Sequence, residues 1–203
     1  MNEKILSFIS VVLCFLFTTP SHANAILTIT PDTQSVSAGS PVSFAVNISG
    51  LGSGIALGAY VLEIGFDSAL LNFSQATFGD PVLGDQLDLL NTGSNAPATT
   101  PSQGKINLIE FSLDDPTTLI ANQASNFTLT TLSFTSLTPG TSPITLSVNS
   151  LTDANATDIE SSTLNGSVTI NRSLNTVFEP EALLLLTCGG LAFLLTQPRN
   201  RFI

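Results

Sequence analysis

The middle segment of this chain, residues 24–178, contains no cysteine, no histidine and no tryptophan. Cys14 and Cys188 lie in the apolar runs at the two ends, and His22, the single histidine, follows the first run. Without His or Cys, the middle segment cannot hold a Ser-His-Asp triad, a Cys-His pair or an ordinary zinc site. Paired carboxylates, such as those of glycosidases, are the catalytic groups that remain.

Basic residues are almost as scarce in the middle of the chain. Between residues 24 and 178 only Lys105 and Arg172 are basic, against twelve acidic residues, so this segment carries essentially the whole net charge of −10. A surface of this kind repels phosphate backbones, which argues against nucleic acid as a partner. It also offers no basic footprint for anionic lipids. We therefore expect an acidic, solvated domain.

The N-terminal end has the three parts of a secretory signal peptide. Lys4 supplies the positive charge, residues 5–19 form an apolar run, and small residues follow after a proline. Cleavage after Ala23 or Ala25 fits this pattern, so residues 1–25 are interpreted as a signal peptide. An uncleaved N-terminal anchor is the alternative, but the run is short for a membrane span. The mature chain is then exported across the inner membrane.

Strict alternation of apolar and polar residues marks the middle segment as β structure. The stretch PVSFAVNIS places Val42, Phe44, Val46 and Ile48 on one face, and AYVLEIGFD and SPITLSVNS repeat the pattern. A period of two is typical of half-buried antiparallel strands. The pattern slips within NFTLTTLSFTSL and GKINLIEFSL, which predicts bulges or strands buried on both faces. With no helical segment between the strands, the sequence predicts an all-β sandwich of jelly-roll or Greek-key type.

Two stretches carry a resemblance to a known family. A G-x-x-V-x-F-x-V-x-I opening runs from Gly39 to Ile48, and an apolar strand leads into Phe66-Asp67 and then into the stretch LLNF. With the late Ser/Thr-rich strand before Pro139-Gly140, this resembles a cohesin-type module, similar to bacterial carbohydrate-binding domains. The resemblance spans residues 26–170. It implies a nine-stranded jelly roll and a binding role, without naming the partner.

The C-terminal end resembles the PEP-CTERM sorting signal. Val177, Glu179 and Pro180 match its short motif, an uncharged leucine-rich run follows, and Arg199 and Arg201 form the basic end. The run predicts a short transmembrane helix over residues 182–196, whose uncharged core reaches only ~21 Å against the ~30 Å of a hydrocarbon core.

The resemblance implies transient membrane association, cleavage by an exosortase-type membrane protease, and delivery to the cell surface or the exopolysaccharide matrix. A plain C-terminal anchor is the alternative. Residues 171–176 are interpreted as a linker between the module and this signal.

Acidic loops raise the question of calcium. In DANATDIE, the residues Asp153, Asn155 and Asp158 offer oxygen ligands at spacings that a Ca²⁺ loop could use. The stretch lacks the glycine and terminal glutamate of an EF-hand loop, so a solvated acidic turn is the preferred interpretation, and no cofactor is expected. The acidic residues of GDPVLGDQLD are likewise interpreted as loop charges, and residues 91–104 as a flexible loop.

The sequence thus predicts an exported binding module that contacts a surface protein or a polysaccharide and does not catalyse a reaction. Two alternatives stay open, a structural protein of the exopolysaccharide matrix and a carboxylate-based glycosidase. Sandwiches that bind sugars stack them on exposed aromatic rings, whereas the one tyrosine, Tyr60, is patterned inward. This favours protein or matrix contact over carbohydrate binding.

Overall fold

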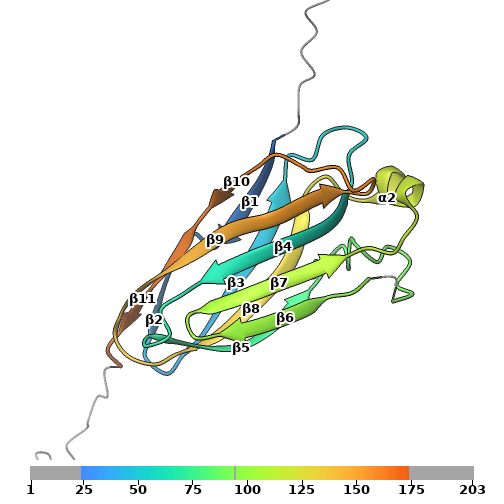
Figure 1. Ribbon diagram of the computed structural model, residues 1–203. Coiled ribbons are helices and arrows are strands. Elements are labelled where there is room, and N and C mark those ends of the chain that lie inside the picture. Colours follow the sequence, from blue (N-terminus) through green and yellow to red (C-terminus); the bar gives the residue numbers. More distant parts are fainter. Residues whose placement is uncertain (1–23, 94, 174–203) are drawn as a thin grey trace, which may run out of the picture. The chain divides into compact units, whose positions relative to one another are not determined.

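The computed structural model describes residues 24–93 and 95–173, which form eleven strands and one short helix (Figure 1). The elements follow one another along the chain as β1 (Ala25–Thr30), β2 (Thr33–Ser37), β3 (Pro41–Ser49), β4 (Leu57–Gly65), β5 (Leu71–Phe78), β6 (Ala98–Ser102), β7 (Lys105–Phe111), α2 (Pro116–Asn122), β8 (Phe127–Ser136), β9 (Gly140–Asp153), β10 (Ser161–Leu164) and β11 (Gly166–Asn171). Residues 1–23 and 174–203 lie outside the described residues, and with them most of the predicted signal peptide, the predicted sorting motif and the predicted helix 182–196. Within the described ranges, no helix is both long enough and apolar enough to span a membrane.

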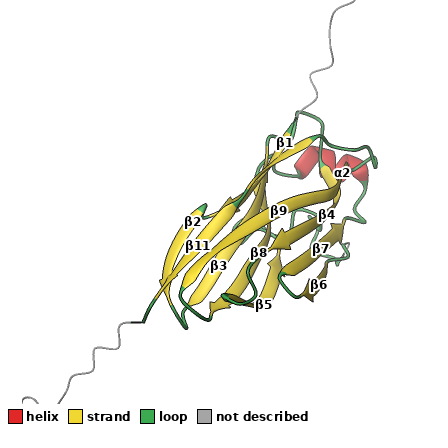
Figure 2. Cartoon of the chain, turned by 60° about the vertical axis from the view of Figure 1, so that its left-hand side comes forward, coloured by secondary structure: helices red, strands yellow, loops and turns green. Residues whose placement is uncertain are grey.

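The strands form a sandwich of two sheets. The five-stranded sheet has the order β10-β1-β3-β8-β5, and the six-stranded sheet has the order β2-β11-β9-β4-β7-β6 (Figure 2). Neighbours are antiparallel except in two pairs, β1 with β10 and β2 with β11. The predicted all-β sandwich is therefore confirmed.

One side of the sandwich is closed by segments that cross from one sheet to the other. The first segment leaves the five-stranded sheet after β1 and joins the six-stranded sheet as β2, and the last segment does the same from β10 to β11. At the second crossing, Asn165 Oδ1 accepts a hydrogen bond from the backbone N–H of Leu146. A Cβ on Gly166 would lie 2.6 Å from Ile29 Cγ2, so a larger residue there would require the Ile29 side chain to shift. Each crossing divides one segment of the chain into two strands. The described residues therefore form eleven strands, whereas the resemblance seen in the sequence implied nine.

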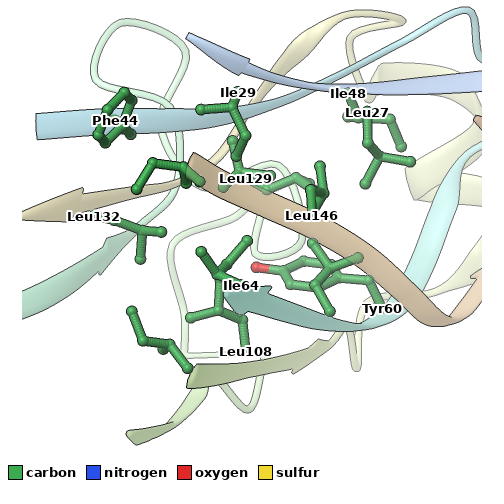
Figure 3. Packing of buried hydrophobic residues seen from close by; sticks show 14 of the residues in the cluster. Leu27, Ile29, Phe44, Ile48, Tyr60, Ile64, Leu108, Leu129, Leu132 and Leu146 are labelled. Carbon is green, nitrogen blue, oxygen red and sulfur yellow. The ribbon is translucent and has the colours of Figure 1, made fainter. Parts of the chain in front are cut away.

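The core lies between the two sheets and is built by the alternation seen in the sequence. Val42, Phe44, Val46 and Ile48 are all buried, as predicted. Figure 3 shows side chains from both sheets directed into this interior, including Ile29 and Leu132 from one sheet and Ile64 and Leu146 from the other. Three phenylalanines contact the ring of Phe134 edge-on, at centroid distances of 5.2 to 6.4 Å. This arrangement of aromatic rings stabilises one end of the core.

The two predicted irregularities have different explanations. In β8 the register with β3 shifts, since Val46 pairs with Thr130 and Asn47 pairs with Thr128, so a bulge at Leu129 accounts for the slip. In β7 the prediction of a bulge or of burial on both faces was wrong, because the pairing with β4 is regular and only one face of the strand is buried. There the pattern slips because Glu110 points inward, whereas Ile109 and Phe111 point outward.

Two further predictions were wrong. The sequence interpretation had no helix, yet α2 begins after Asp115, whose carboxylate accepts from Thr117 N as an N-cap, with Pro116 in the first turn. The loop expected over residues 91–104 contains the edge strand β6, which pairs with β7. Both elements lie at the ends or edges of the sheets, where short segments give weak sequence patterns.

Candidate functional site: an apolar stripe beside a buried carboxylate

The outer face of the six-stranded sheet carries an apolar stripe, formed by Ala59 and Val61 on β4 and by Ile109 and Phe111 on β7. The register places Ala59 opposite Phe111 and Val61 opposite Ile109, so the four side chains are neighbours on one face. Ile109 is 37% exposed and Phe111 is 43% exposed. Ala59 and Val61 beside them are partly exposed. Contiguous apolar side chains on an outer face are a feature of surfaces that contact other macromolecules.

Small hydroxyl side chains and one ion pair border this apolar stripe. On the β9 side, Ser150 and Thr152 pair with Val61 and Ala59. Further along the face, Lys105 Nζ lies 2.8 Å from Glu63 Oε1. This pair is half-exposed and contributes little to stability. The surface is therefore an apolar centre with a neutral border and a single salt bridge.

The outer face of the five-stranded sheet is different. Its four main strands, β1, β3, β8 and β5, present hydroxyl and amide side chains. These are Thr28, Thr30, Ser43, Asn47, Ser49, Asn72, Gln75, Thr77, Thr131, Ser133 and Thr135. On these strands the exposed large apolar side chain is Ile26, at 38%. The apolar stripe thus distinguishes one outer face of the sandwich from the other.

A hollow of about 170 Å³ lies where the apolar stripe reaches the end of the sandwich that holds α2. Ala59 and Phe111 form part of its lining, together with Leu119 of α2 and the acidic residues Asp114 and Asp153. The hollow is small and shallow, and it extends the stripe toward an acidic border.

Directly beneath the apolar stripe, Glu110 is buried, with only 1% of its surface exposed. Tyr60 donates its hydroxyl to Glu110 Oε2 at 2.6 Å, and Asn95 Nδ2 donates to Glu110 Oε1 at 2.8 Å. The same Asn95 nitrogen also donates to Asp85 Oδ2 at 2.5 Å. Two carboxylates from distant parts of the chain thus share one amide group.

The protonation of this cluster differs from that of surface carboxylates. Burial raises the pKa of Glu110 from 4.5 to about 7, and the nearby Asp85 charge adds to the rise, although the hydrogen bonds from Tyr60 and Asn95 act against it. Burial, followed by the charge of Glu110, raises the pKa of Tyr60 well above its ordinary value. A carboxyl group with such a pKa has the chemistry of a general acid, but at 1% exposure Glu110 is not accessible to a substrate.

The acidic loop, defined here as residues 79–93, is held by its own carboxylates. Asp80 accepts from the backbone N–H groups of Val82, Leu83 and Thr128. Asp88 accepts from Thr92 N and Gly93 N, and it is itself 7% exposed. The interpretation as loop charges was therefore incomplete, because these carboxylates cap turns and one of them is buried.

The acidic loop is also attached to the end of β7. Ser112 donates its hydroxyl to the carbonyl oxygen of Leu87 at 2.6 Å, and Leu89 N donates to Asp114 Oδ2 at 3.0 Å. Leu87 itself is 1% exposed. The loop, the buried cluster and the outer end of β7 therefore form one connected unit.

The residues considered for calcium lie in the turn between β9 and β10. Asp153 Oδ1 accepts from the backbone N–H groups of Asn155 and Thr157, each at 2.8 Å, while Asn155 and Asp158 are exposed. In the two described ranges, no three His, Cys, Asp or Glu side chains are grouped so that they could hold a metal ion. The residues predicted for signal cleavage and sorting that lie outside those ranges are Ala23, Val177, Glu179, Pro180, Arg199 and Arg201.

Sequence reasoning missed both the apolar stripe and the buried carboxylate. It placed Glu110 among the solvated charges, whereas alternation from Ile106 through Leu108 places residue 110 on the inner face. The expectation of a wholly solvated acidic domain was wrong at Glu110 and Asp88. Following the period of two through β7 without a break would have indicated both features.

Comparison with known proteins identifies the family. A family model for the cohesin domain matches residues 27–170, which is most of the chain. This chain belongs to the cohesin domain family. The resemblance seen in the sequence is thereby confirmed.

Solved cohesin structures share the fold. The chain is 25% identical to CaCohA2, in a complex with CaDoc0917, with a TM-score of 0.56 and coverage of 73% of this chain and 100% of the other; CaCohA2 comes from Clostridium acetobutylicum. A type I cohesin–dockerin complex, Coh-OlpA-Doc918 from Clostridium thermocellum, gives 15% identity, a TM-score of 0.58 and coverage of 73% and 99%. A non-cellulosomal cohesin from the archaeon Archaeoglobus fulgidus gives 15% identity, a TM-score of 0.54 and coverage of 80% and 97%. A search of curated proteins gave no match.

Proposed function

We propose that this cohesin module binds a partner protein of the dockerin type through the outer face of β9, β4, β7 and β6. The apolar stripe of Ala59, Val61, Ile109 and Phe111 is the observation that carries the proposal, because no such row exists on the main strands of the other sheet. Two central strands present it on a rigid surface, which suits recognition of a folded partner. The similar type I structure is itself a cohesin–dockerin complex, which supports this class of partner.

The chemistry of the face supports protein rather than sugar as the ligand. Phe111 is the exposed aromatic residue on this face, and it stands at one end of the apolar stripe, next to Ala59. Sandwiches that bind sugars commonly stack them on exposed aromatic rings, whereas a protein interface has an apolar centre with a polar rim. The hydroxyl groups of β9 and the pair formed by Glu63 and Lys105 supply that rim.

The binding experiment compares two isoleucines of matched exposure on opposite sheets. Ile109→Asp places a charge in the apolar stripe, and Ile26→Asp places the same charge on the other outer face. A panel of dockerin modules, beginning with Doc918, is titrated against the protein by calorimetry. We expect at least one module to bind, with an affinity that Ile109→Asp weakens at least about tenfold and Ile26→Asp leaves unchanged. Equal effects of the two substitutions, or no binding by any module, would overturn the proposal.

We also propose that the module is exported and then delivered to the cell surface or the exopolysaccharide matrix. The signal peptide is expected to be removed after Ala23 rather than after Ala25. Ala25 is fully buried as the first residue of β1, and its N–H donates to the carbonyl oxygen of Glu160. Cleavage after Ala25 would remove this contact. N-terminal sequencing of the exported protein should therefore begin at Asn24, and a start at Ile26 would contradict this choice.

The C-terminal sorting signal is proposed to be cut by an exosortase-type protease near Glu179-Pro180. Mass spectrometry of the protein recovered from the surface should then find no peptide from residues 183–203. Replacing Glu179 and Pro180 with Ala should leave the uncut precursor in the inner membrane, whereas the fold of residues 26–170 stays unchanged. Recovery of residues 195–203 on surface protein would show a plain anchor instead.

A further inference from the structure

The buried cluster joins two parts of the molecule, strand β7 and the acidic loop. Glu110 belongs to β7, in the middle of the six-stranded sheet, whereas Asp85 belongs to the acidic loop. Asn95, which follows the loop, donates the same nitrogen to both carboxylates, at 2.8 Å and 2.5 Å. The charge state of this pair therefore acts directly on the attachment of the loop.

The surroundings of Glu110 contain no positive charge that could balance two ionised carboxylates. Tyr60 from β4 and Asp85 from the acidic loop are the titratable groups that face it. The two basic residues within the described ranges are engaged elsewhere: Lys105 pairs with Glu63 on the outer face, and Arg172 follows the end of β11. With both carboxylates ionised, the repulsion acts in a buried site with low screening.

We propose that a proton held by Glu110, beside the Asp85 carboxylate, fastens the acidic loop to the sandwich, and that loss of this proton as the pH rises loosens the loop together with the outer end of β7. A protonated Glu110 removes the repulsion and can donate to the Asp85 carboxylate. The ionised form retains only the hydrogen bonds from Tyr60 and Asn95. The loop is the part that yields, because its residues 82, 83 and 90 are exposed, whereas Glu110 lies in a regularly paired strand.

The loosening reaches the proposed binding face because Ile109 and Phe111 flank Glu110 on the same strand. Phe111 O accepts from Ala96 N, and the neighbouring Ser112 holds Leu87 of the loop. A loop that detaches from Ser112 therefore removes support from the end of the apolar stripe. This second part of the proposal rests on the proposed function, since it makes partner binding dependent on pH.

The proton-dependent attachment of the acidic loop is called the latch below. Hydrogen exchange on the free protein tests it without any partner. The backbone amides of Leu87, Leu89, Thr92 and Gly93 all donate within this unit, so their protection factors report on its closure. We expect these factors, corrected for base catalysis, to fall several-fold between about pH 5.5 and about pH 8.5. Glu110→Gln, which keeps the shape of the protonated side chain, should hold them at the acidic value. Glu160→Gln, the same substitution at an exposed position outside this unit, should behave as the unmodified protein does.

Two outcomes would overturn the latch. Protection factors that do not change with pH would do so, as would an equal change in the Glu110→Gln protein. Dockerin binding, measured at both pH values, then tests the link to the face: affinity should fall at alkaline pH in the unmodified protein and stay constant in Glu110→Gln. If no dockerin binds at either pH, the proposed function is wrong, whereas the hydrogen-exchange result is unaffected. The failure of the proposed function can therefore be distinguished from the failure of the latch.

Discussion

Tyr60 donates its hydroxyl to Glu110 at 2.6 Å inside the sandwich, which joins the one tyrosine of the chain to a carboxylate on the neighbouring strand. The two residues belong to β4 and β7, are opposite each other in the register, and are both nearly inaccessible to solvent. Each polar group is a hydrogen-bond partner of the other. Burying the pair therefore costs little free energy of folding as long as both members are present.

Removing the tyrosine hydroxyl should therefore destabilise the protein. Tyr60→Phe leaves Glu110 with Asn95 as its remaining donor, and we expect the free energy of unfolding to fall by about 1–3 kcal/mol at alkaline pH. Because the Tyr60 hydrogen bond lowers the pKa of Glu110, the substitution should also move its titration upward. Denaturant unfolding measures the first effect. A matching experiment in the Glu110→Gln background should show a smaller loss, and an equal loss there would contradict the coupling.

Stability should decrease as the pH rises through the neutral range. Glu110 has a folded pKa of about 7 and an unfolded pKa of 4.5, so between these values the folded state holds a proton that the unfolded state has released. Its contribution is complete below pH 4.5 and is lost as the pH passes through about 7. Above that range, Glu110→Gln should be more stable than the unmodified protein by up to roughly 3 kcal/mol. Parallel pH–stability curves for the two proteins would rule this out.

Gly166 should not tolerate a side chain unless Ile29 gives way. A Cβ at position 166 would lie 2.6 Å from Ile29 Cγ2, at the point where the last segment crosses between the sheets. Gly166→Ala should lower the free energy of unfolding by about 1–3 kcal/mol through overpacking. In an Ile29→Ala background, where Cγ2 is absent, the same substitution should cost much less. If the thermal midpoint falls equally in both backgrounds, the clash is not the cause.

Millimolar Ca²⁺ should leave the thermal midpoint unchanged. The turn that holds Asp153, Asn155 and Asp158 is already closed by hydrogen bonds from backbone N–H groups to Asp153 Oδ1. Any ion that bound the folded state alone would raise the midpoint by linkage. Differential scanning calorimetry with and without EDTA decides the question, and Asp158→Asn serves as the matched variant. An EDTA-reversible rise that this variant abolishes would establish a calcium site.

The sequence predicted those parts of the fold whose pattern is local. The alternation of β3 is complete over nine residues, and its inward side chains are the buried ones. In β7 the pattern misleads, because Ile109 and Phe111 are apolar yet exposed and Glu110 is charged yet buried. Burial of that carboxylate depends on Tyr60 and Asn95, which lie 50 and 15 residues away, and a local pattern carries no information about such partners.

The helix was missed for a different reason. At seven residues, α2 is too short to show a helical period, although Asp115 and Pro116 provided the start signal. Its C-terminal neighbour Gln123 fixes it to β4 by accepting from Leu57 N and donating to Leu57 O. A helix of seven residues is too short to be stable by itself, so these tertiary hydrogen bonds stabilise α2.

The crossing segments on the closed side of the sandwich have a consequence for the order in which the chain folds. The first and last segments pair with each other in both sheets, and Asn171 Nδ2 donates to Ser35 Oγ across 136 residues of chain. Closing so large a loop carries an entropic cost that local contacts do not offset, and it slows folding. The two sheets therefore cannot be completed until residues 161–171, which form β10 and β11, are available to pair with β1 and β2. Under the export proposed above, the chain could complete its fold only after this last segment had crossed the membrane.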